Sequence, residues 1–178
     1  MYLVSCYFDK KTEERILQYI RQIAKTTGNG YMIENHVPAH MTISAFETKQ
    51  ESEAIKALGK IVTNLQQGTL QWASVGVFLP YVLFISPVYN SYLHELMVKV
   101  YEAILPIEDI SIRSCYQPFQ WLPHTTVAKK LSKDEMTKAF EVLQKSFGMF
   151  EGRITRIGLA KTNPYQDLMS WDLSISER

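Results

Sequence analysis

An internal repeat constrains this sequence more than any other feature. The stretch HMTISAFETKQE begins at residue 40 and the stretch HTTVAKKLSKDE begins at residue 124, an offset of 84 residues without a gap. The register pairs residues of the same or related type: His40 with His124, Thr42 with Thr126, Thr48 with Ser132, Glu51 with Glu135, Gly68 with Gly152, and Leu70 with Ile154. Two copies are too few for a solenoid, so the repeat indicates two similar lobes in one chain.

Both copies predict the same local structure. A short strand carries the histidine and the threonine, a T/S-x-x-E capping box follows, and an amphipathic helix ends near a glycine before the next strand. The capping boxes are Thr48 with Glu51 and Ser132 with Glu135, and an earlier helix has Thr12 as its expected N-cap. The expected strands are 2–8, 40–46, 69–79, 81–88, 124–129, 153–161 and 168–176, and the expected helices are 12–25, 51–65, 91–105 and 133–147. The segment 107–122 is expected to be irregular or a weak strand.

The alternation of strands and helices, with no linker between them, predicts one domain covering residues 1–178. The expected fold class is α+β: a bilobal fold of two pseudo-twofold-related β-α-β-α-β lobes, with antiparallel-rich sheets flanking a central cleft. The lobes are expected to be interleaved, with the internal repeat at about residues 40–79 and 124–163. Such an arrangement would place the two histidines on opposite sides of the cleft.

Composition limits the partners that this chain can have. Nineteen Lys and Arg against 18 Asp and Glu give a formal charge of +1, which argues against wrapping long nucleic acid. No apolar run reaches the ~20 residues of a membrane span, and the first residues do not resemble a signal peptide. Cys6 and Cys115 lie far apart in no metal or redox motif, so we expect reduced thiols and a cytoplasmic location. We expect a monomer.

The two His-x-Thr pairs carry the chemistry. Side chains two residues apart on a strand point to the same face, so His40 and Thr42 share a face, as do His124 and Thr126. Imidazole titrates near neutral pH and can serve as base or acid, and a threonine hydroxyl can donate to a phosphoryl oxygen. Two facing pairs would form a phosphodiester site. The alternative interpretation is that both histidines are hydrogen-bonded strand residues of a duplicated fold.

The motifs His40-Met41-Thr42-Ile43 and His124-Thr125-Thr126-Val127 resemble those of the 2H (two-histidine) phosphoesterase superfamily, which includes the bacterial 2'-5' RNA ligase-like proteins and cyclic phosphodiesterases. The resemblance covers nearly the whole chain. It implies a bilobal α+β fold and a terminal or 2',3'-cyclic phosphate as substrate, with no metal or other cofactor. It also implies that His40 and His124 are the acid/base pair and that Thr42 and Thr126 bind phosphate.

Other side chains are weaker candidates for substrate contacts. Base stacking would need aromatic residues at the cleft, and a phosphate would need basic ones. Packing in the core or a solvated position is the favoured interpretation for each of them. His36 and His40 are four residues apart but lie in a presumed loop, so a metal pair is not expected. The candidate contacts are Tyr7, Phe119, Trp121 and Tyr165 among aromatic residues, and Arg113, Lys129 and Arg156 among basic ones.

The leading hypothesis is a phosphodiesterase that acts on a small nucleotide or an RNA end. A second is an RNA end-joining ligase that uses the same histidines in the reverse direction, because the acid and the base exchange roles on reversal. A third is a nucleotide-binding module without turnover. Retention of both histidines in this sequence favours the two enzymatic hypotheses.

Overall fold

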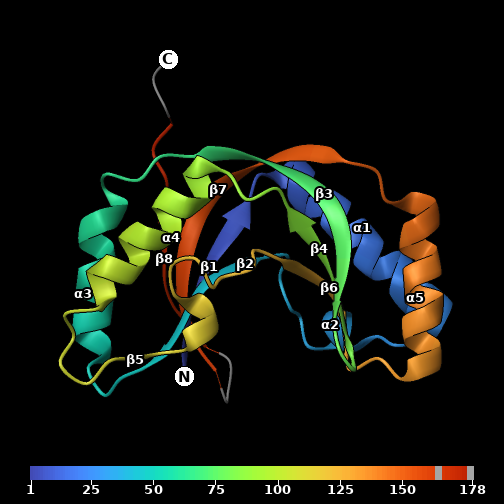
Figure 1. Ribbon diagram of the computed structural model, residues 1–178, viewed down its shortest axis with the longest axis horizontal. Helices are drawn as coiled ribbons and strands as arrows, with labels where there is room; N and C mark the ends of the chain where they lie inside the picture. The colour runs from blue at the N-terminus through green and yellow to red at the C-terminus, as the bar shows by residue number, and fades with distance from the viewer. Residues whose placement is uncertain (163–165, 176–178) are drawn as a thin grey trace.

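A computed structural model describes residues 1–162 and 166–175. Strands and helices alternate, with two pairs of helices at opposite ends of a strongly twisted sheet (Figure 1). The elements in chain order are β1 (Tyr2–Phe8), α1 (Lys10–Thr27), α2 (Tyr31–Glu34), β2 (Met41–Glu47), α3 (Glu51–Val62), β3 (Gly68–Phe78), β4 (Val82–Pro87), α4 (Ser91–Ile104), β5 (Ser111–Ile112), the 3-10 helix η1 (Ser114–Tyr116), β6 (Thr125–Lys129), α5 (Lys133–Ser146), β7 (Phe150–Lys161) and β8 (Gln166–Asp172).

The sheet confirms the α+β class and the antiparallel pairing. Its strand order is β5-β2-β1-β7-β3-β4-β6, and β8 pairs with the C-terminal half of β7. Every named strand pair is antiparallel. The elements β1, α1, β2, α3 and β3 form the first unit, and β4, α4, β6, α5 and β7 form the second. The third strand of each unit pairs with the first strand of the other. Strand β7 pairs with β1, and β3 pairs with β4. The two units are therefore interleaved.

The pairing of β3 with β7 reveals the pseudo-twofold axis. Thr69 pairs with Arg153, its own equivalent at the 84-residue offset. On either side the equivalents exchange, with Gly68 opposite Ile154 and Leu70 opposite Gly152. A local twofold rotation through the central pair produces this register, so the internal repeat is a symmetry of the sheet.

Each of the two repeated glycines leaves room for a side chain from a helix segment. A Cβ at Gly68 would collide with the ring of Tyr92 at the start of α4, and a Cβ at Gly152 would collide with Thr12 at the start of α1. The helices approach the central strands closely at these two equivalent points. Glycine is required there for packing and not for a special backbone angle.

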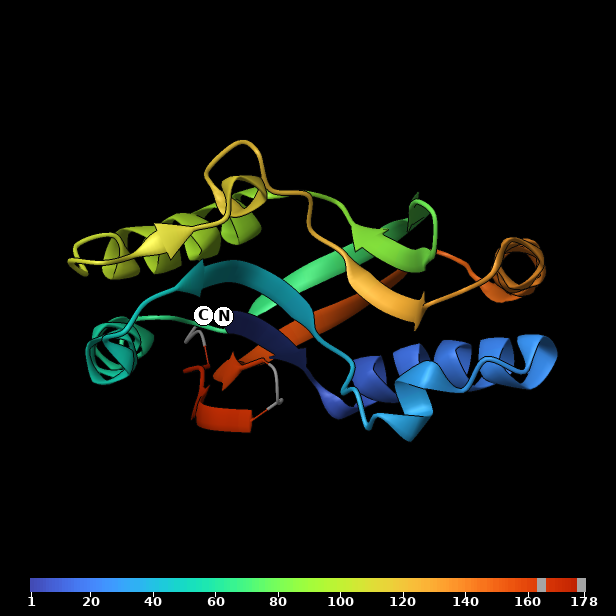
Figure 2. The same ribbon diagram turned by 90° about the horizontal axis from the view of Figure 1, so that it is seen from below.

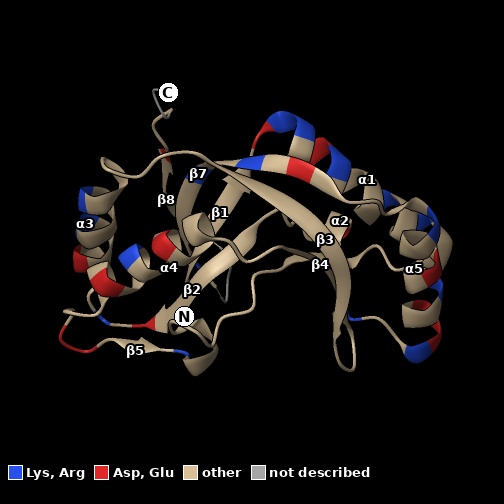
Figure 3. Ribbon diagram, turned by 45° about the horizontal axis from the view of Figure 1, so that its top comes forward, with Lys and Arg blue, Asp and Glu red and all other residues tan. Residues whose placement is uncertain are grey.

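At each end of the sheet, one helix of the first unit packs against one helix of the second unit. Helix α1 packs against α5 and β6, and α3 packs against α4. The view from below shows the strands running between these two helix pairs (Figure 2). Acidic and basic residues are mixed along α1, α3, α4 and α5 (Figure 3). In the described part of the chain, no helix is both long and apolar enough to cross a membrane.

Aromatic residues fill the core beside the axis. The Trp72 side chain is fully buried on β3, stacked on Phe150 with ring centroids 5.0 Å apart and edge-on to Phe8 at 5.1 Å. Its indole Nε1 donates to Thr125 Oγ1 at 3.4 Å, which satisfies a hydroxyl on the core side of the second motif. This cluster joins strands of both repeated units, so burial of apolar surface holds the two units together.

One of the two predicted capping boxes is confirmed and the other is wrong. Ser132 caps α5, and the Glu135 side chain returns to the Ser132 amide. In the first copy the N-cap is Gln50, without a side-chain bond, and Thr48 instead donates to Asp109. The Glu51 carboxylate accepts from Tyr2 and Lys161. Residues distant in the sequence therefore form the hydrogen bonds of Thr48 and Glu51.

The N-cap of α1 is Asp9 and not Thr12 as predicted. The Asp9 carboxylate accepts from the amide and the hydroxyl of Thr12 and also from the amide of Arg153. At the other end, Gly28 closes the helix in the left-handed region at a φ of 79°. The sequence also missed the short helix α2. The segment predicted to be irregular or a weak strand contains the two-residue strand β5 and the 3-10 helix η1.

Replacement of Asp9 by Ala should lower the free energy of unfolding by about 1–2 kcal/mol, because it removes a helix cap and leaves the Arg153 amide of β7 without its acceptor. Ser132→Ala, which removes only a local cap, should cost less. Urea denaturation of the two variants measures the difference. Equal losses would mean that the contact of Asp9 with β7 contributes nothing to stability.

Candidate active site

The two motif histidines are held in the same way. Each lies one residue before its strand, and each directs Nδ1 to the carbonyl oxygen two residues earlier. The distances are 2.8 Å from His40 Nδ1 to Pro38 O and 2.9 Å from His124 Nδ1 to Leu122 O. A carbonyl can only accept, so Nδ1 carries a proton in both rings. The neutral imidazoles therefore keep a lone pair on Nε2, the atom available for proton transfer.

The tertiary structure brings both motifs into one cavity. A cavity of about 220 Å³ is lined by His40, Thr42, His124 and Thr126 together with Lys129 and Tyr116. The two motifs belong to strands far apart in the sheet, because β2 and β6 are separated by β1, β7, β3 and β4 in the strand order. The two His-x-Thr pairs thus face a common space large enough for a phosphate group.

Burial lowers the pKa of both histidines below the ordinary value of 6.5, although their bonds to backbone carbonyls act in the opposite direction. For His40, the positive charges of His124 and Lys129 lower the pKa further. Because the unfolded chain binds these protons more readily, the free energy of unfolding should fall as the pH drops through 6.5. At neutral pH the free site therefore favours uncharged imidazoles.

The surroundings of the two histidines differ. His124 is flanked by aromatic rings, edge-on to Phe78 with centroids 4.8 Å apart and tilted against Phe84 at 5.3 Å. On the His40 side a second cavity of about 590 Å³ adjoins the first and shares His40, Tyr31 and Lys129 with it. A nucleoside fits a cavity of this size.

The structure places only some of the other predicted contacts at these cavities. Tyr7 lines the larger cavity. The Arg156 guanidinium lies 4.7 Å from the centroid of the Tyr7 ring, but Arg156 lines neither cavity. Lys129 lines both cavities. Arg113 lines neither of them and is exposed, with its amide bonded to Ala45 O. Tyr165 lies outside the described residues.

Trp121 and Phe119 are also away from the cavity walls. Trp121 is only 7% exposed, and its Nε1 donates to the carbonyl oxygen of Thr42 at 3.1 Å. Phe119 is 85% exposed and lies against the ring of His94 at 5.0 Å. Trp121 therefore packs in the core, the interpretation favoured from the sequence, and its indole nitrogen binds the first motif strand.

Sequence reasoning missed several residues that line the site. Tyr31 lines both cavities from α2, with the Lys130 ammonium 4.6 Å from its ring centroid. Tyr116 lines the motif cavity from η1, and His36 lines the larger one with a φ of 50°. These residues belong to short segments outside the repeat, where hydrophobic periodicity carries no signal.

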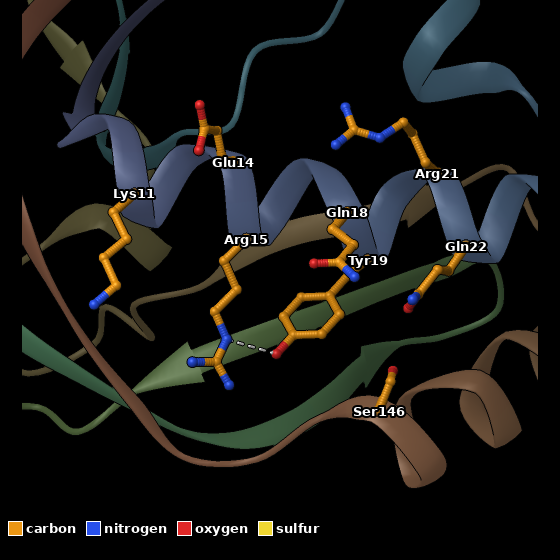
Figure 4. A pocket seen from close by; sticks show the side chains of 8 residues that line it. All are labelled: Lys11, Glu14, Arg15, Gln18, Tyr19, Arg21, Gln22 and Ser146. Atoms are coloured by element: carbon orange, nitrogen blue, oxygen red, sulfur yellow. Dashed lines mark hydrogen bonds between the residues drawn. The ribbon is translucent and has the colours of Figure 1, made fainter.

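A larger depression of about 760 Å³ lies along the outer face of α1 near the end of α5 (Figure 4). Its walls mix Lys11, Glu14 and Arg21 with side-chain amides. Arg15 is already held there, because it donates to Tyr19 Oη at 3.0 Å and lies 4.2 Å from the centroid of the Phe150 ring. Since no histidine of the described chain lines this depression, the motif cavity is the better candidate for proton-transfer chemistry.

A metal site does not emerge from the described side chains. Over residues 1–162 and 166–175, no three His, Cys, Asp or Glu side chains are grouped so that they could hold a metal ion. His36 and His40 both line the larger cavity, but no third such residue in these ranges joins them. The polar groups in the motif cavity are imidazoles, hydroxyls and an ammonium.

Comparison with solved structures identifies the fold as that of phosphoesterases. The matches include a structure of E. coli LigT complexed with ATP (16% identity, TM-score 0.59, 97% of this chain and 96% of that chain). The protein TT0787 of Thermus thermophilus also matches (11%, TM-score 0.64, 99% and 99%). So does the MHV ns2 PDE domain (13%, TM-score 0.54, 97% and 100%). At these identities the likeness establishes the fold.

A match to a protein-family model identifies the family. Residues 8–166 match the model of the 2'-5' RNA ligase superfamily, so the chain belongs to this superfamily. A search of curated proteins finds no significant match. The resemblance drawn from the two motifs is therefore confirmed at the level of the family, and the roles of individual residues stay predictions.

Lys129→Gln should raise the pKa of His40 and leave that of His124 nearly unchanged, because the positive charge of Lys129 acts on His40. Titration of the histidine C2 protons by NMR at low salt measures both values. Lys130→Gln is the matched control, since it removes the same charge one residue further along. An equal shift of both histidines would contradict the asymmetry described above.

Proposed function

We propose that this protein is a metal-independent phosphodiesterase that hydrolyses a 2',3'-cyclic or 2'-5' phosphodiester of a small nucleotide or RNA end. The observation that carries the proposal is the common cavity lined by both His-x-Thr pairs. Membership of the 2'-5' RNA ligase superfamily supports this class of reaction. Solved structures of E. coli LigT in complex with ATP, NADP+ and 3'-AMP support a nucleotide as the ligand.

In the proposed reaction one imidazole is the base and the other is the acid. His40 is assigned as the base, because burial and the charge of Lys129 keep it in the neutral form that can accept a proton. Its Nε2 takes a proton from water as the water oxygen attacks phosphorus. His124, in its protonated form, gives the proton on Nε2 to the leaving ribose oxygen as the P–O bond breaks. Thr42 and Thr126 donate hydrogen bonds to the non-bridging oxygens, on which negative charge accumulates.

The pH dependence follows from this scheme. Activity requires one neutral and one protonated histidine, so kcat/KM for a 2',3'-cyclic nucleotide should follow a bell. Because both free-site pKa values lie below 6.5, the maximum should fall on the acidic side of that value. Initial rates from about pH 4.5 to about pH 8.5 measure it. A profile that rises continuously above neutral pH would exclude the assigned roles.

Replacement of either histidine by Ala should lower kcat/KM by about 10²–10⁴-fold, and the double variant should lose much less than the product of the two effects. Thr42→Val and Thr126→Val should be milder, because proton transfer remains. His94→Ala is the matched control, since this half-buried histidine on α4 lines neither cavity. An activated p-nitrophenyl phosphodiester should partly rescue His124→Ala only, because its leaving group needs no acid. Rescue of His40→Ala instead would reverse the roles.

Turnover should survive treatment with EDTA, since the proposed steps use imidazoles and hydroxyls alone. The rate with the cyclic nucleotide is measured before and after chelation and after addition of Mg²⁺ or Mn²⁺. If EDTA abolished turnover and one of these ions restored it, the reaction would depend on a metal ion and the proposed mechanism would be wrong.

Joining of RNA ends is the second candidate function, favoured by the name of the superfamily. The same two histidines would act in the reverse direction, with a ribose hydroxyl as the nucleophile. A 2',3'-cyclic phosphate oligonucleotide incubated with a 5'-hydroxyl acceptor distinguishes the two reactions. A 2'-5'-linked product would indicate joining, and an open phosphomonoester would indicate hydrolysis.

A further inference from the structure

The larger cavity beside His40 has walls that differ from the equivalent part of the second unit. Leu3 on β1 pairs with Ala160 on β7, and both residues line this cavity. The equivalent pair in the second unit is Phe84 on β4 with Gly76 on β3, since Gly76 and Ala160 are 84 residues apart. A leucine and an alanine therefore stand where the second unit has a phenylalanine and a glycine.

Two phenyl rings occupy the equivalent position beside His124. A Cβ at Gly76 would collide with the ring of Phe84, so this ring lies directly on β3. Phe78, the equivalent of Thr162 at the 84-residue offset, packs on Phe84 with ring centroids 4.4 Å apart. Both rings also contact the ring of His124. In the first unit Thr162 lines the larger cavity, so smaller side chains leave open the space that the two rings take in the second.

The larger cavity has the features that a nucleoside requires. It shares Leu3, His40 and Lys129 with the motif cavity, so a ligand whose phosphate lies between the two motifs can extend into it. The rings of Tyr7 and Tyr31 line it, and aromatic side chains are the groups on which unpaired bases stack. Its volume of about 590 Å³ accommodates a ribose and a base.

We propose that the larger cavity binds the nucleoside of the substrate, and that the site selects a single nucleoside because Phe78 and Phe84 occupy the equivalent position beside His124. The inference rests on the proposed function, which places the phosphate in the motif cavity. A nucleoside 2',3'-cyclic phosphate carries both ester oxygens on one ribose and needs only this nucleoside. In a 2'-5' diester the leaving nucleoside would lie on the side of His124, the assigned acid, and would meet phenyl rings there.

Truncated substrates measure the contribution of each side. In the wild type, kcat/KM for the best of the four common nucleoside 2',3'-cyclic phosphates should exceed that for base-free ribose 2',3'-cyclic phosphate about 5- to 100-fold, the effect of stacking one base. A 2'-5' dinucleotide and the methyl ester of the corresponding nucleoside 2'-phosphate should differ much less, because the second nucleoside gains no cavity. A second nucleoside that contributes as much as the base would overturn the single-nucleoside assignment.

Thr162→Phe gives the first unit the side chain that the second unit has at this position. The ratio of kcat/KM for the cyclic nucleotide to that for the base-free substrate should fall toward unity, mainly through a higher KM for the nucleotide. Thr69→Phe is the matched control, because it makes the same change at an exposed position of β3 that lines neither cavity, and it should keep the wild-type ratio. An unchanged ratio in Thr162→Phe would overturn the proposal.

A second variant keeps the test valid if the larger side chain at residue 162 prevents folding. Tyr31→Leu removes a ring from the wall without filling the cavity, so it should lower the same ratio. Because both substrates carry the same cyclic phosphate, a general loss of activity cancels in the ratio. Equal losses with the two substrates would mean that Tyr31 does not contact the base, and the assigned nucleoside site would be wrong.

Ligand binding distinguishes failure of this inference from failure of the proposed function. The four nucleoside 3'-monophosphates and inorganic phosphate are titrated into the wild type and Thr162→Phe, followed by the histidine C2 proton signals. Thr162→Phe should weaken binding of the nucleotides far more than binding of phosphate. If the wild type shows this pattern but hydrolyses no cyclic phosphate, the proposed function is refuted and the nucleoside site stands. If it hydrolyses nucleotide and base-free substrate equally well, the function stands and the nucleoside site is refuted.

Discussion

The pairing of β3 with β7 is the contact on which the rest of the structure depends. Each of these strands ends one repeated unit and pairs with the first strand of the other, so neither unit has a complete sheet by itself. Apart from β5 and β8, three strands lie on each side of the axis, in the order β2-β1-β7 and β3-β4-β6. Twist accumulates across these strands and turns the outer ones toward each other. The strands β2 and β6 carry the motifs, so the cavity is a consequence of the strand pairing between the two units.

The symmetry of the fold extends to the chemistry of the histidines. In both copies a carbonyl two residues before the histidine accepts from Nδ1, which fixes the ring and its tautomer. Acid and base roles require the two rings to differ. The difference comes from neighbours that the repeat does not share: Lys129 and the larger cavity beside His40, and the rings of Phe78 and Phe84 beside His124.

Segments outside the repeat add to this asymmetry. Helix α2 adds Tyr31 to the wall beside His40. The segment from η1 to β6 adds Tyr116 to the cavity and ties Trp121 to the backbone of the first motif. A duplicated scaffold thus holds two histidines in the same way, and the unlike segments before the two motif strands give them different surroundings. This division allows the surroundings of the site to change without disturbing the sheet.

The sequence by itself determined the two motifs, the interleaved repeat and the helix and strand types, because these depend on periodicity and spacing along the chain. It also predicted the α5 capping box, whose partners are three residues apart. It failed at Thr12, because Asp9 three residues earlier is the cap and binds the Thr12 hydroxyl. It failed at the Thr48–Glu51 box, because Asp109 and Tyr2 bind these side chains from distant positions. Burial of Trp121 and entry of Tyr116 into the cavity were likewise decided by tertiary packing, since no local pattern states which face of an irregular segment meets the sheet.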